Sequence, residues 1–380
     1  MTGYDLAVVG AGICGLAHAL AAARRGKRVV VIDRDAQANG ASVRNFGFIT
    51  VTGQQAGVCW ERAMRSRDVW AEMAPLAGIP VLQKGLLTIA RRPEALAVLE
   101  QFCETDMGVD CCLLSPDALL ARYDGLRAAE FAGALYSPHE LRVESREAIP
   151  RLAAFLAERH GVTFLRDTVV HAAAPPRLET SRGRLEAEAM VVCPGDDFRS
   201  LHSDRIAAYD LTRCKLHMMR VRPSTYDARL PPVMSDLGLV RYLGYSEQPA
   251  AAALRTRLEA EQAAQLRHGI HLIVVRSADG SLVVGDSHHY ADTPDPFAPT
   301  EVDELILDEY AAVFDGPPPV RIEHWTGTYA SAPDRLMLID RPADALRIVL
   351  ITSGTGASTS FAIGEEVVAE LYGSQSAGGQ

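Results

Sequence analysis

Three glycines near the N-terminus have the spacing that lets a backbone approach a pyrophosphate. Gly10, Gly12 and Gly15 form a G-x-G-x-x-G pattern between an apolar run, residues 4–9, and a segment with helical apolar spacing. In this pattern the first glycine makes the turn, the second admits the phosphates and the third lets the helix pack against the strand. Asp33 ends the next apolar run, where a carboxylate can accept from ribose hydroxyls. We therefore predict a dinucleotide site and not a glycine turn without a ligand.

Two glycine-bearing turns late in the chain also follow apolar runs. Residues 189–195 (AMVVCPG) end one run, and residues 353–356 (SGTG) stand between another run and a helical pattern. A glycine-rich turn that opens a helix presents unpaired amides and the positive end of the helix dipole, which suits an anion or a carbonyl. We expect these turns to join the N-terminal unit in one nucleotide-binding domain.

The elements that must position these turns are spread over the whole chain. A length of 380 residues is large for one core, so two domains are expected. Helical patterns fall at residues 57–76, 93–107, 146–160, 252–266, 301–314 and 363–372, and strand-like runs at 86–90, 162–164, 190–193, 216–221, 270–275, 282–285 and 348–352. The prediction is a discontinuous nucleotide-binding domain, residues 1–77, 141–205 and 325–380, with a second domain over the cofactor, residues 78–140 and 206–324.

The composition and charge of the chain argue against several classes of partner. The net charge of −10 argues against binding to nucleic acid or to an anionic membrane, and no apolar run has the length of a membrane span. The seven cysteines lack metal-ligand spacing, and together with an N-terminus that is already a strand they predict reduced thiols in the cytoplasm. Adjacent histidines such as His288 and His289 point apart in extended chain, so no metal site is predicted.

In sequence order, these segments resemble the FAD-dependent oxidoreductases of the D-amino-acid oxidase and sarcosine oxidase type, over nearly the whole chain. The matching segments are residues 10–15 with Asp33, the loop at 41–47 (ASVRNFG), the strand end at 191–195, the element at 332–340 and the helix start at 353–360. The resemblance implies a Rossmann-like α/β FAD-binding domain of the glutathione-reductase-2 type and a mixed, largely antiparallel substrate domain. The implied FAD contacts are Gly10, Gly12, Ile13, Cys14, Gly15, Asp33, Arg34, Ser42, Arg44, Asn45, Phe46, Gly47, Val169, Cys193, Gly195, Gly327, Ser353, Gly354, Gly356, Ala357 and Ser358.

A narrower resemblance concerns the substrate. The strings RNFG, LRVESREAIP, CKLHMMR and GDSHHY resemble a bacterial branch associated with aminophosphonate breakdown. This implies oxidation of the C–N bond of a 2-aminoethylphosphonate-like amine, or of its N-methyl or 1-hydroxy derivative. The imine would be hydrolysed to an aldehyde and ammonia or an amine, and O2 would be reduced to H2O2. The alternatives are an oxidase or dehydrogenase of amino acids or N-methyl amino acids, a nicotinamide-dependent dehydrogenase, and a nucleotide-sensing protein. Either a monomer or a homodimer is compatible.

Five residues are the candidates for contact with the substrate. Arg44 can pair with the FAD phosphates or with a substrate anion, and Asp286 can attract a substrate ammonium. The resemblance places His271, Tyr329 and His217 at the cavity as well. For each of these residues a purely structural position remains an alternative: a loop arginine, a buried tyrosine or a histidine with its bonds satisfied elsewhere.

Three positions depart from the sarcosine oxidase pattern. Gly327 stands where those enzymes attach flavin through a cysteine, so noncovalent FAD is expected. Val283 replaces the lysine that activates oxygen, which puts fast oxygen reactivity in doubt. Ser358 replaces the lysine that holds a substrate carboxylate, so the anion of this substrate is expected to be held differently.

Overall fold

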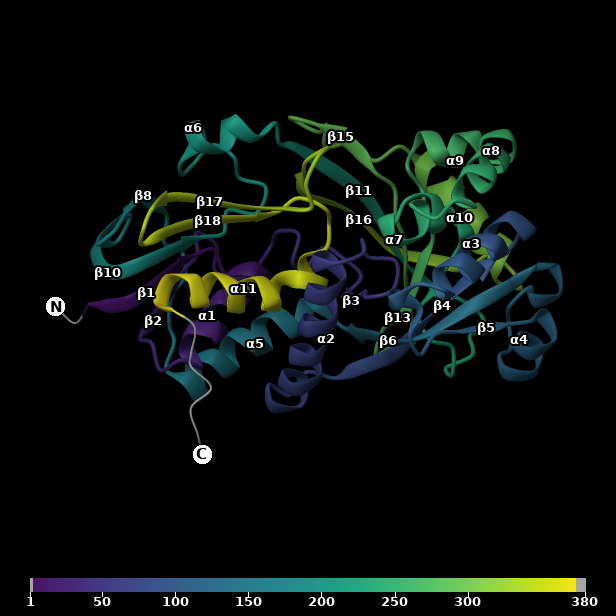
Figure 1. Ribbon diagram of the computed structural model, residues 1–380, viewed down its shortest axis with the longest axis horizontal. Helices are drawn as coiled ribbons and strands as arrows, with labels where there is room; N and C mark the ends of the chain where they lie inside the picture. The colour runs from purple at the N-terminus through teal and green to yellow at the C-terminus, as the bar shows by residue number, and fades with distance from the viewer. Residues whose placement is uncertain (1–2, 374–380) are drawn as a thin grey trace.

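The computed structural model describes residues 3–373 of the chain, and its strands form two sheets (Figure 1). The first has the strand order β17-β18-β10-β1-β2-β7, with a β8–β9 hairpin extending β10. Its strands are β1 (Tyr4–Val9), β2 (Val29–Ile32), β7 (Thr163–Leu165), β8 (Val170–Ala174), β9 (Arg177–Thr180), β10 (Gly183–Val192), β17 (Met337–Ala343) and β18 (Leu346–Ile351).

The central strands of this sheet are parallel and buried. Strands β18, β10, β1, β2 and β7 all run in one direction, and every residue of β2 is buried. Figure 1 shows helices α1 (Ile13–Ala23), α5 (Ser145–His160) and α11 (Gly356–Tyr372) along one face of the sheet. Leu16, Leu152 and Val367 of these helices share one core. Because the strands are parallel, their carboxyl ends, and the turns that follow them, lie along one edge of the sheet.

The second sheet has ten strands and is mixed, as the family resemblance implies. Only β4 and β12 pair in parallel among its described pairs, and the rest are antiparallel. The strands are β3 (Phe48–Ile49), β4 (Val81–Ala90), β5 (Cys112–Leu114), β6 (Gly133–Val143), β11 (Thr212–Arg222), β12 (Val233–Met234), β13 (Ile273–Arg276), β14 (Leu282–Gly285), β15 (His289–Ala291) and β16 (Val320–Ser331).

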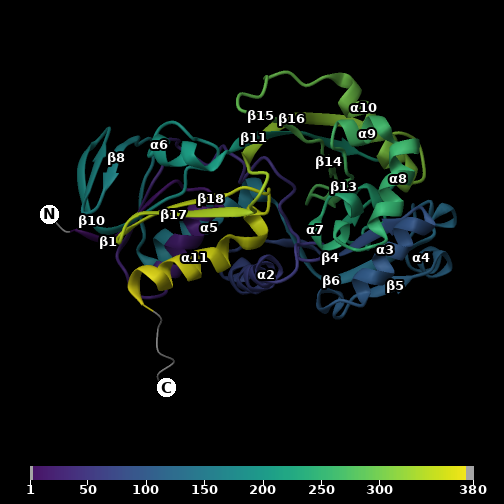
Figure 2. The same ribbon diagram turned by 45° about the horizontal axis from the view of Figure 1, so that its top comes forward.

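Six helices pack against the second sheet, and most of them share one hydrophobic core with it (Figure 2). They are α3 (Pro93–Cys103), α4 (Pro116–Arg122), α7 (Leu243–Ser246), α8 (Ala251–Glu261), α9 (Ala263–Arg267) and α10 (Thr300–Val313). Helix α2 (Val58–Leu76) packs beside α11, and the short α6 (Ser203–Ile206) leads towards β11. Among the described residues, no helix combines the length and the apolar character that crossing a membrane requires.

Several predicted elements have different bounds in the structure. The helix expected over residues 252–266 is interrupted at Gln262, whose buried amide donates to Glu309 Oε2 at 2.7 Å and accepts from Arg92 Nη2 at 2.8 Å. Helix α11 begins at Gly356, earlier than its apolar pattern suggests. The division into two domains stays a prediction. Strand β3 pairs with β6 in the second sheet, and β16 crosses the expected boundary before residue 325.

Candidate active site

A cavity of about 820 Å³ lies where the carboxyl edge of the first sheet meets the second sheet. Its walls include the turns after β1, β2, β10 and β18, together with residues of β11, β13 and β16. This is the size at which proteins hold a large part of a cofactor or drug-sized ligand. The cavity therefore joins the predicted nucleotide turns to the predicted substrate residues.

The glycine turn after β1 has no space for side chains. A Cβ atom at Gly10, whose φ is +103°, would lie 2.4 Å from the carbonyl oxygen of Cys193. At Gly15 it would lie 1.8 Å from the carbonyl oxygen of Gly10, and at Gly12 it would lie 2.8 Å from Ser42 Oγ. Glycine at positions 10 and 15 therefore lets the turn pack closely against neighbouring backbone, and glycine at position 12 leaves the backbone open beside the cavity.

The polar groups beside this turn are held by backbone amides. Asp33 Oδ2 accepts from the Ala11 amide at 2.6 Å, and its Oδ1 accepts from the Asp35 amide at 2.9 Å. Ser42 Oγ accepts from the Ile13 amide at 2.9 Å. The other amides of the first turn of α1 have no partner within the helix and suit a pyrophosphate. These features fit the dinucleotide part of FAD, with Asp33 placed to accept from its ribose.

Most of the predicted FAD contacts face this cavity. Gly15 and Gly47 are exceptions, because each packs closely against backbone and neither lines the cavity. Asn45 lines it, but its amide bonds within its own loop, donating to Ala41 O and accepting from the Gly47 amide, both at 2.6 Å. The predicted residues that line the cavity are Gly10, Gly12, Ile13, Cys14, Asp33, Arg34, Ser42, Arg44, Asn45, Phe46, Val169, Cys193, Gly195, Gly327, Ser353, Gly354, Gly356, Ala357 and Ser358.

At another part of the cavity wall, two histidines surround a buried carboxyl group. Asp286 Oδ1 lies 3.2 Å from His271 Nδ1, and Asp286 Oδ2 lies 3.7 Å from His288 Nε2. Backbone pairing brings them together, because His271 and Asp286 exchange two amide hydrogen bonds at the ends of β13 and β14. Burial raises the pKa of Asp286 to about 7 and lowers the pKa values of both histidines. One carboxylate oxygen of Asp286 and one ring nitrogen of each histidine lie within 4.8 Å of one another, close enough to hold a metal ion. The sequence did not predict this cluster.

Arg241 is a cavity residue that sequence reasoning missed. It is half-buried, it donates to Tyr290 Oη at 3.0 Å, and no carboxylate lies within 4.0 Å of its guanidinium among the described ion pairs. The next residue, Tyr242, places its hydroxyl 3.4 Å from His271 Nε2. The only signal in the sequence is an arginine set among apolar and aromatic neighbours, GLVRYLGY. Tyr329, which was predicted, also lines this part of the cavity.

His217 does not lie at the cavity. Leu216 lines it, and because side chains alternate along β11, His217 points to the opposite face of the sheet. Its Nδ1 lies 3.6 Å from Asp303 Oδ1, and its ring lies beside that of His289. His288 and His289 indeed diverge, His288 towards Asp286 and His289 towards His217.

Comparisons with known proteins agree with this architecture. A glycine oxidase from Geobacillus kaustophilus (strain HTA426) is 26% identical over 206 residues, which span 50% of this chain and 54% of that protein. The crystal structure of glycine oxidase from Geobacillus kaustophilus superposes with a TM-score of 0.78 at 20% identity, covering 99% of this chain and 96% of that one. The L-proline dehydrogenase of P. horikoshii gives 0.78 at 19% identity, covering 97% and 93%. These two structures show the fold.

The family comparison covers almost all of the described residues. The model of the FAD dependent oxidoreductase family, DAO, matches residues 5–371. This range includes the glycine turn, Asp33 and the turn that opens α11, which are the features that fit the cofactor. The chain belongs to the DAO family of FAD dependent oxidoreductases, and its cofactor is FAD.

Proposed function

We propose that this enzyme oxidises the C–N bond of a small amine that carries an anionic head group. Bound FAD would supply the group that accepts the two electrons removed from the substrate. The observation that carries the proposal is the presence of two groups in one cavity. Among the described residues, Asp286 Oδ1 is buried without a hydrogen-bond partner, and Arg241 donates to Tyr290 and not to a carboxylate. Asp286 would receive the ammonium of the substrate, and Arg241 its anion.

Asp286 suits a group that must lose a proton before it is oxidised. Its Oδ1 atom is buried, and neither this atom nor the facing His271 Nδ1 has a hydrogen-bond partner among the described residues. A substrate ammonium would fill this gap. Because burial brings the pKa of Asp286 to about 7, the carboxylate can also accept the ammonium proton near neutral pH.

Arg241 suits a carboxylate or a phosphonate. A guanidinium can donate two parallel hydrogen bonds to either group, and among the described residues the hydrogen bond that Arg241 donates goes to Tyr290 and not to a carboxylate. Ser358, at the position where relatives of the sarcosine oxidase type carry a lysine, is already used: its Oγ accepts from the Thr50 amide at 2.9 Å. This is consistent with a different grip on the anion. Arg44, which donates to Asn39 Oδ1 at 3.2 Å, is the second candidate for an anion, of either FAD or the substrate.

Our first choice of substrate is an aminophosphonate, 2-aminoethylphosphonate or its N-methyl or 1-hydroxy derivative. The choice is based on the sequence strings described above and on the guanidinium of Arg241, which donates to Tyr290 and not to a carboxylate among the described residues. The imine product would be hydrolysed to an aldehyde and ammonia or an amine, and O2 would be reduced to H2O2.

The second choice is an amino acid or N-methyl amino acid. Similarity to a glycine oxidase and to an L-proline dehydrogenase favours it. A carboxylate would pair with Arg241 by the same two hydrogen bonds as a phosphonate, so the arrangement of the cavity supports both substrates.

An anaerobic reduction screen tests the proposal. The holoenzyme is mixed with each amine in turn, and the loss of flavin absorbance at about 450 nm is followed. The panel contains the three aminophosphonates, glycine, sarcosine and D-alanine. Ethylamine lacks the anion and ethylphosphonate lacks the amine, so these two are matched controls. Rapid bleaching by the zwitterions and not by either control is expected. Equal bleaching by ethylamine would contradict the anionic head group, and bleaching by glycine or sarcosine alone would contradict the aminophosphonate.

A further inference from the structure

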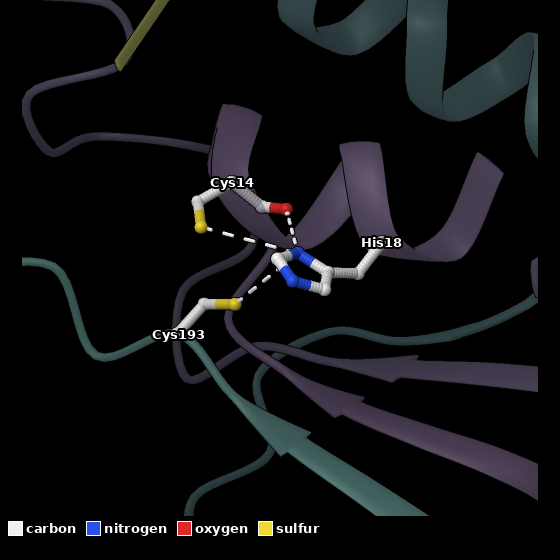
Figure 3. A group of neighbouring side chains, drawn as sticks. All are labelled: Cys14, His18 and Cys193. Carbon is white, nitrogen blue, oxygen red and sulfur yellow. Dashed lines mark hydrogen bonds between the residues drawn. The ribbon is translucent and has the colours of Figure 1, made fainter. Parts of the chain in front are cut away.

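Two cysteines and a histidine meet at the dinucleotide end of the cavity (Figure 3). Cys14 lies in the first turn of α1, and Cys193 directly follows β10. His18 lies one turn further along α1, with its Nδ1 atom 4.0 Å from Cys14 Sγ and 3.9 Å from Cys193 Sγ. The two sulfur atoms and this nitrogen all lie within 4.8 Å of one another. Segments that are far apart in the sequence therefore hold two thiols close together.

Both cysteines are partly exposed in the described structure. Cys14 and Cys193 are free cysteines of intermediate exposure, and both line the cavity. The backbone around them is fixed, since the Cys193 amide donates to Val9 O at 2.8 Å and the Gly10 turn packs against Cys193. The sulfur atoms lie within 4.8 Å of each other and would have to approach to about 2.05 Å to form a disulfide.

The surroundings of Cys14 favour its thiolate. The hydrogen bond from the Cys193 thiol lowers the pKa of Cys14, and His18 acts in the same direction against the effect of burial. A thiolate beside a neutral thiol is the arrangement from which disulfides form, because only the thiolate attacks an oxidant.

A metal ion fits this cluster less well than a disulfide. His18 Nδ1 lies 2.7 Å from the carbonyl oxygen of Cys14. A carbonyl oxygen can only accept, so this nitrogen carries the hydrogen and has no lone pair for a metal. The other ring nitrogen, Nε2, is buried without a partner and is not the atom that faces the sulfurs.

We propose that Cys14 and Cys193 form a reversible thiol–disulfide pair that is oxidised by hydrogen peroxide. The Cys14 thiolate attacks one oxygen of the peroxide, the O–O bond breaks, and with one proton the products are a sulfenic acid and water. The Cys193 thiol then attacks the Cys14 sulfur, a disulfide forms, and a second water leaves. Two electrons pass from the two thiols to the peroxide. This inference depends on the proposed function only for the source of the oxidant, which is the H2O2 that an oxidase would release.

Peptide mass spectrometry of the oxidised holoenzyme tests the pair. Reduced and desalted holoenzyme is treated with added H2O2, quenched with catalase, blocked with N-ethylmaleimide and digested without reductant. The expected product is a cross-linked pair of peptides containing Cys14 and Cys193, about 2 Da lighter than the two thiol peptides together, that dithiothreitol separates. Because the oxidant is added, the result does not depend on whether the enzyme oxidises any amine.

Three outcomes would overturn the proposal. One is labelling of both cysteines by N-ethylmaleimide at peroxide doses that oxidise the exposed Cys112. Another is direct conversion of Cys14 to sulfinic acid without the cross-link. The third is about one zinc ion per chain that blocks both thiols before oxidation. The Cys193→Ser variant should lose the cross-link and leave a Cys14 sulfenic acid that dimedone traps, whereas the matched Cys59→Ser variant should keep the cross-link. If Cys193→Ser does not fold, the measurement on the unaltered chain still decides.

Discussion

Asp286 Oδ1 faces His271 Nδ1 across 3.2 Å, and neither atom has a hydrogen-bond partner among the described residues. Both side chains are buried, with exposed fractions of 5% and 2%. A buried polar atom without a partner is unfavourable by about 1–3 kcal/mol, and folded proteins rarely retain such atoms. Two such atoms facing each other beside the cavity support the proposal that a substrate ammonium binds here.

The pH dependence of turnover follows from this pair. Below about pH 7 Asp286 becomes protonated and can neither attract an ammonium nor accept its proton. We expect kcat/KM to fall about tenfold per pH unit as the pH drops from 6.5 to 5.5. Asp286→Asn should lower kcat/KM by roughly 10²–10⁴ and remove this acidic limb. Steady-state rates between pH 5.5 and 8 check the profile, and an unchanged acidic limb in Asp286→Asn would assign it to another group.

Arg241 should control the response to the substrate anion. A charge-assisted hydrogen bond contributes roughly 1.5–3 kcal/mol, so Arg241→Ala is expected to raise KM about 10- to 150-fold for the zwitterionic amine. Arg241→Lys keeps the charge but not the paired donors, and should give an intermediate value. The control substrate is an amine without an anion, whose poor turnover should not change. A similar KM for the zwitterion in all three proteins would show that the anion binds elsewhere, with Arg44 as the next residue to replace.

Two alanine substitutions in the glycine turn should have different effects, one on cofactor binding and the other on thermal stability. At Gly12 the added methyl group of alanine would meet Ser42 Oγ, a side-chain atom that can move. We expect the Gly12→Ala apoprotein to have nearly the Tm of the unaltered apoprotein. The same variant should retain much less FAD after gel filtration. At Gly15 the methyl group would meet the backbone of Gly10. Gly15→Ala should therefore lower Tm even without FAD. Equal thermal stability of the two apoproteins, measured by differential scanning fluorimetry with an external dye, would contradict this distinction.

The sequence predicts the nucleotide turn well because its determinants are local. Gly10, Gly12, Gly15 and Asp33 all fall within one strand–turn–helix–strand stretch, although Gly10 and Gly12 are confined by Cys193 and Ser42 from outside that stretch. A single stretch of chain therefore contains the whole signal. In the turn that opens α11 the glycine spacing is also local, but Gly354 packs against Tyr329 of β16.

The substrate side depends on contacts that the sequence does not encode locally. Alternation along β11 shows that His217 shares a face with its second neighbours, but not which face meets the cavity, and the predicted face was the wrong one. His271 and Asp286 meet through pairing of two chain segments. Arg241 lies in an irregular connection between β12 and β13, where neither the two-residue nor the 3.6-residue period applies. Its position depends on the tertiary packing around it.

The free energy of unfolding should also depend on the ionisation of the Asp286 carboxyl group. Its pKa is raised to about 7 in the folded chain by burial, against about 4 when unfolded, so between these values the folded state binds more protons than the unfolded state. The contribution of this group to the free energy of unfolding therefore decreases as the pH rises from about 4 to about 7, and stays constant above pH 7.

The Asp286→Asn substitution removes that dependence on pH. The difference in stability between the variant and the unaltered protein should grow in favour of the variant across this window, by a few kcal/mol at most. Urea unfolding of both proteins without substrate at pH 5 and pH 8 measures it, and the other titrating groups largely cancel because both proteins share them. A difference that is the same at the two pH values would mean that Asp286 is ionised throughout, and would remove the basis for its role as the proton acceptor near neutral pH.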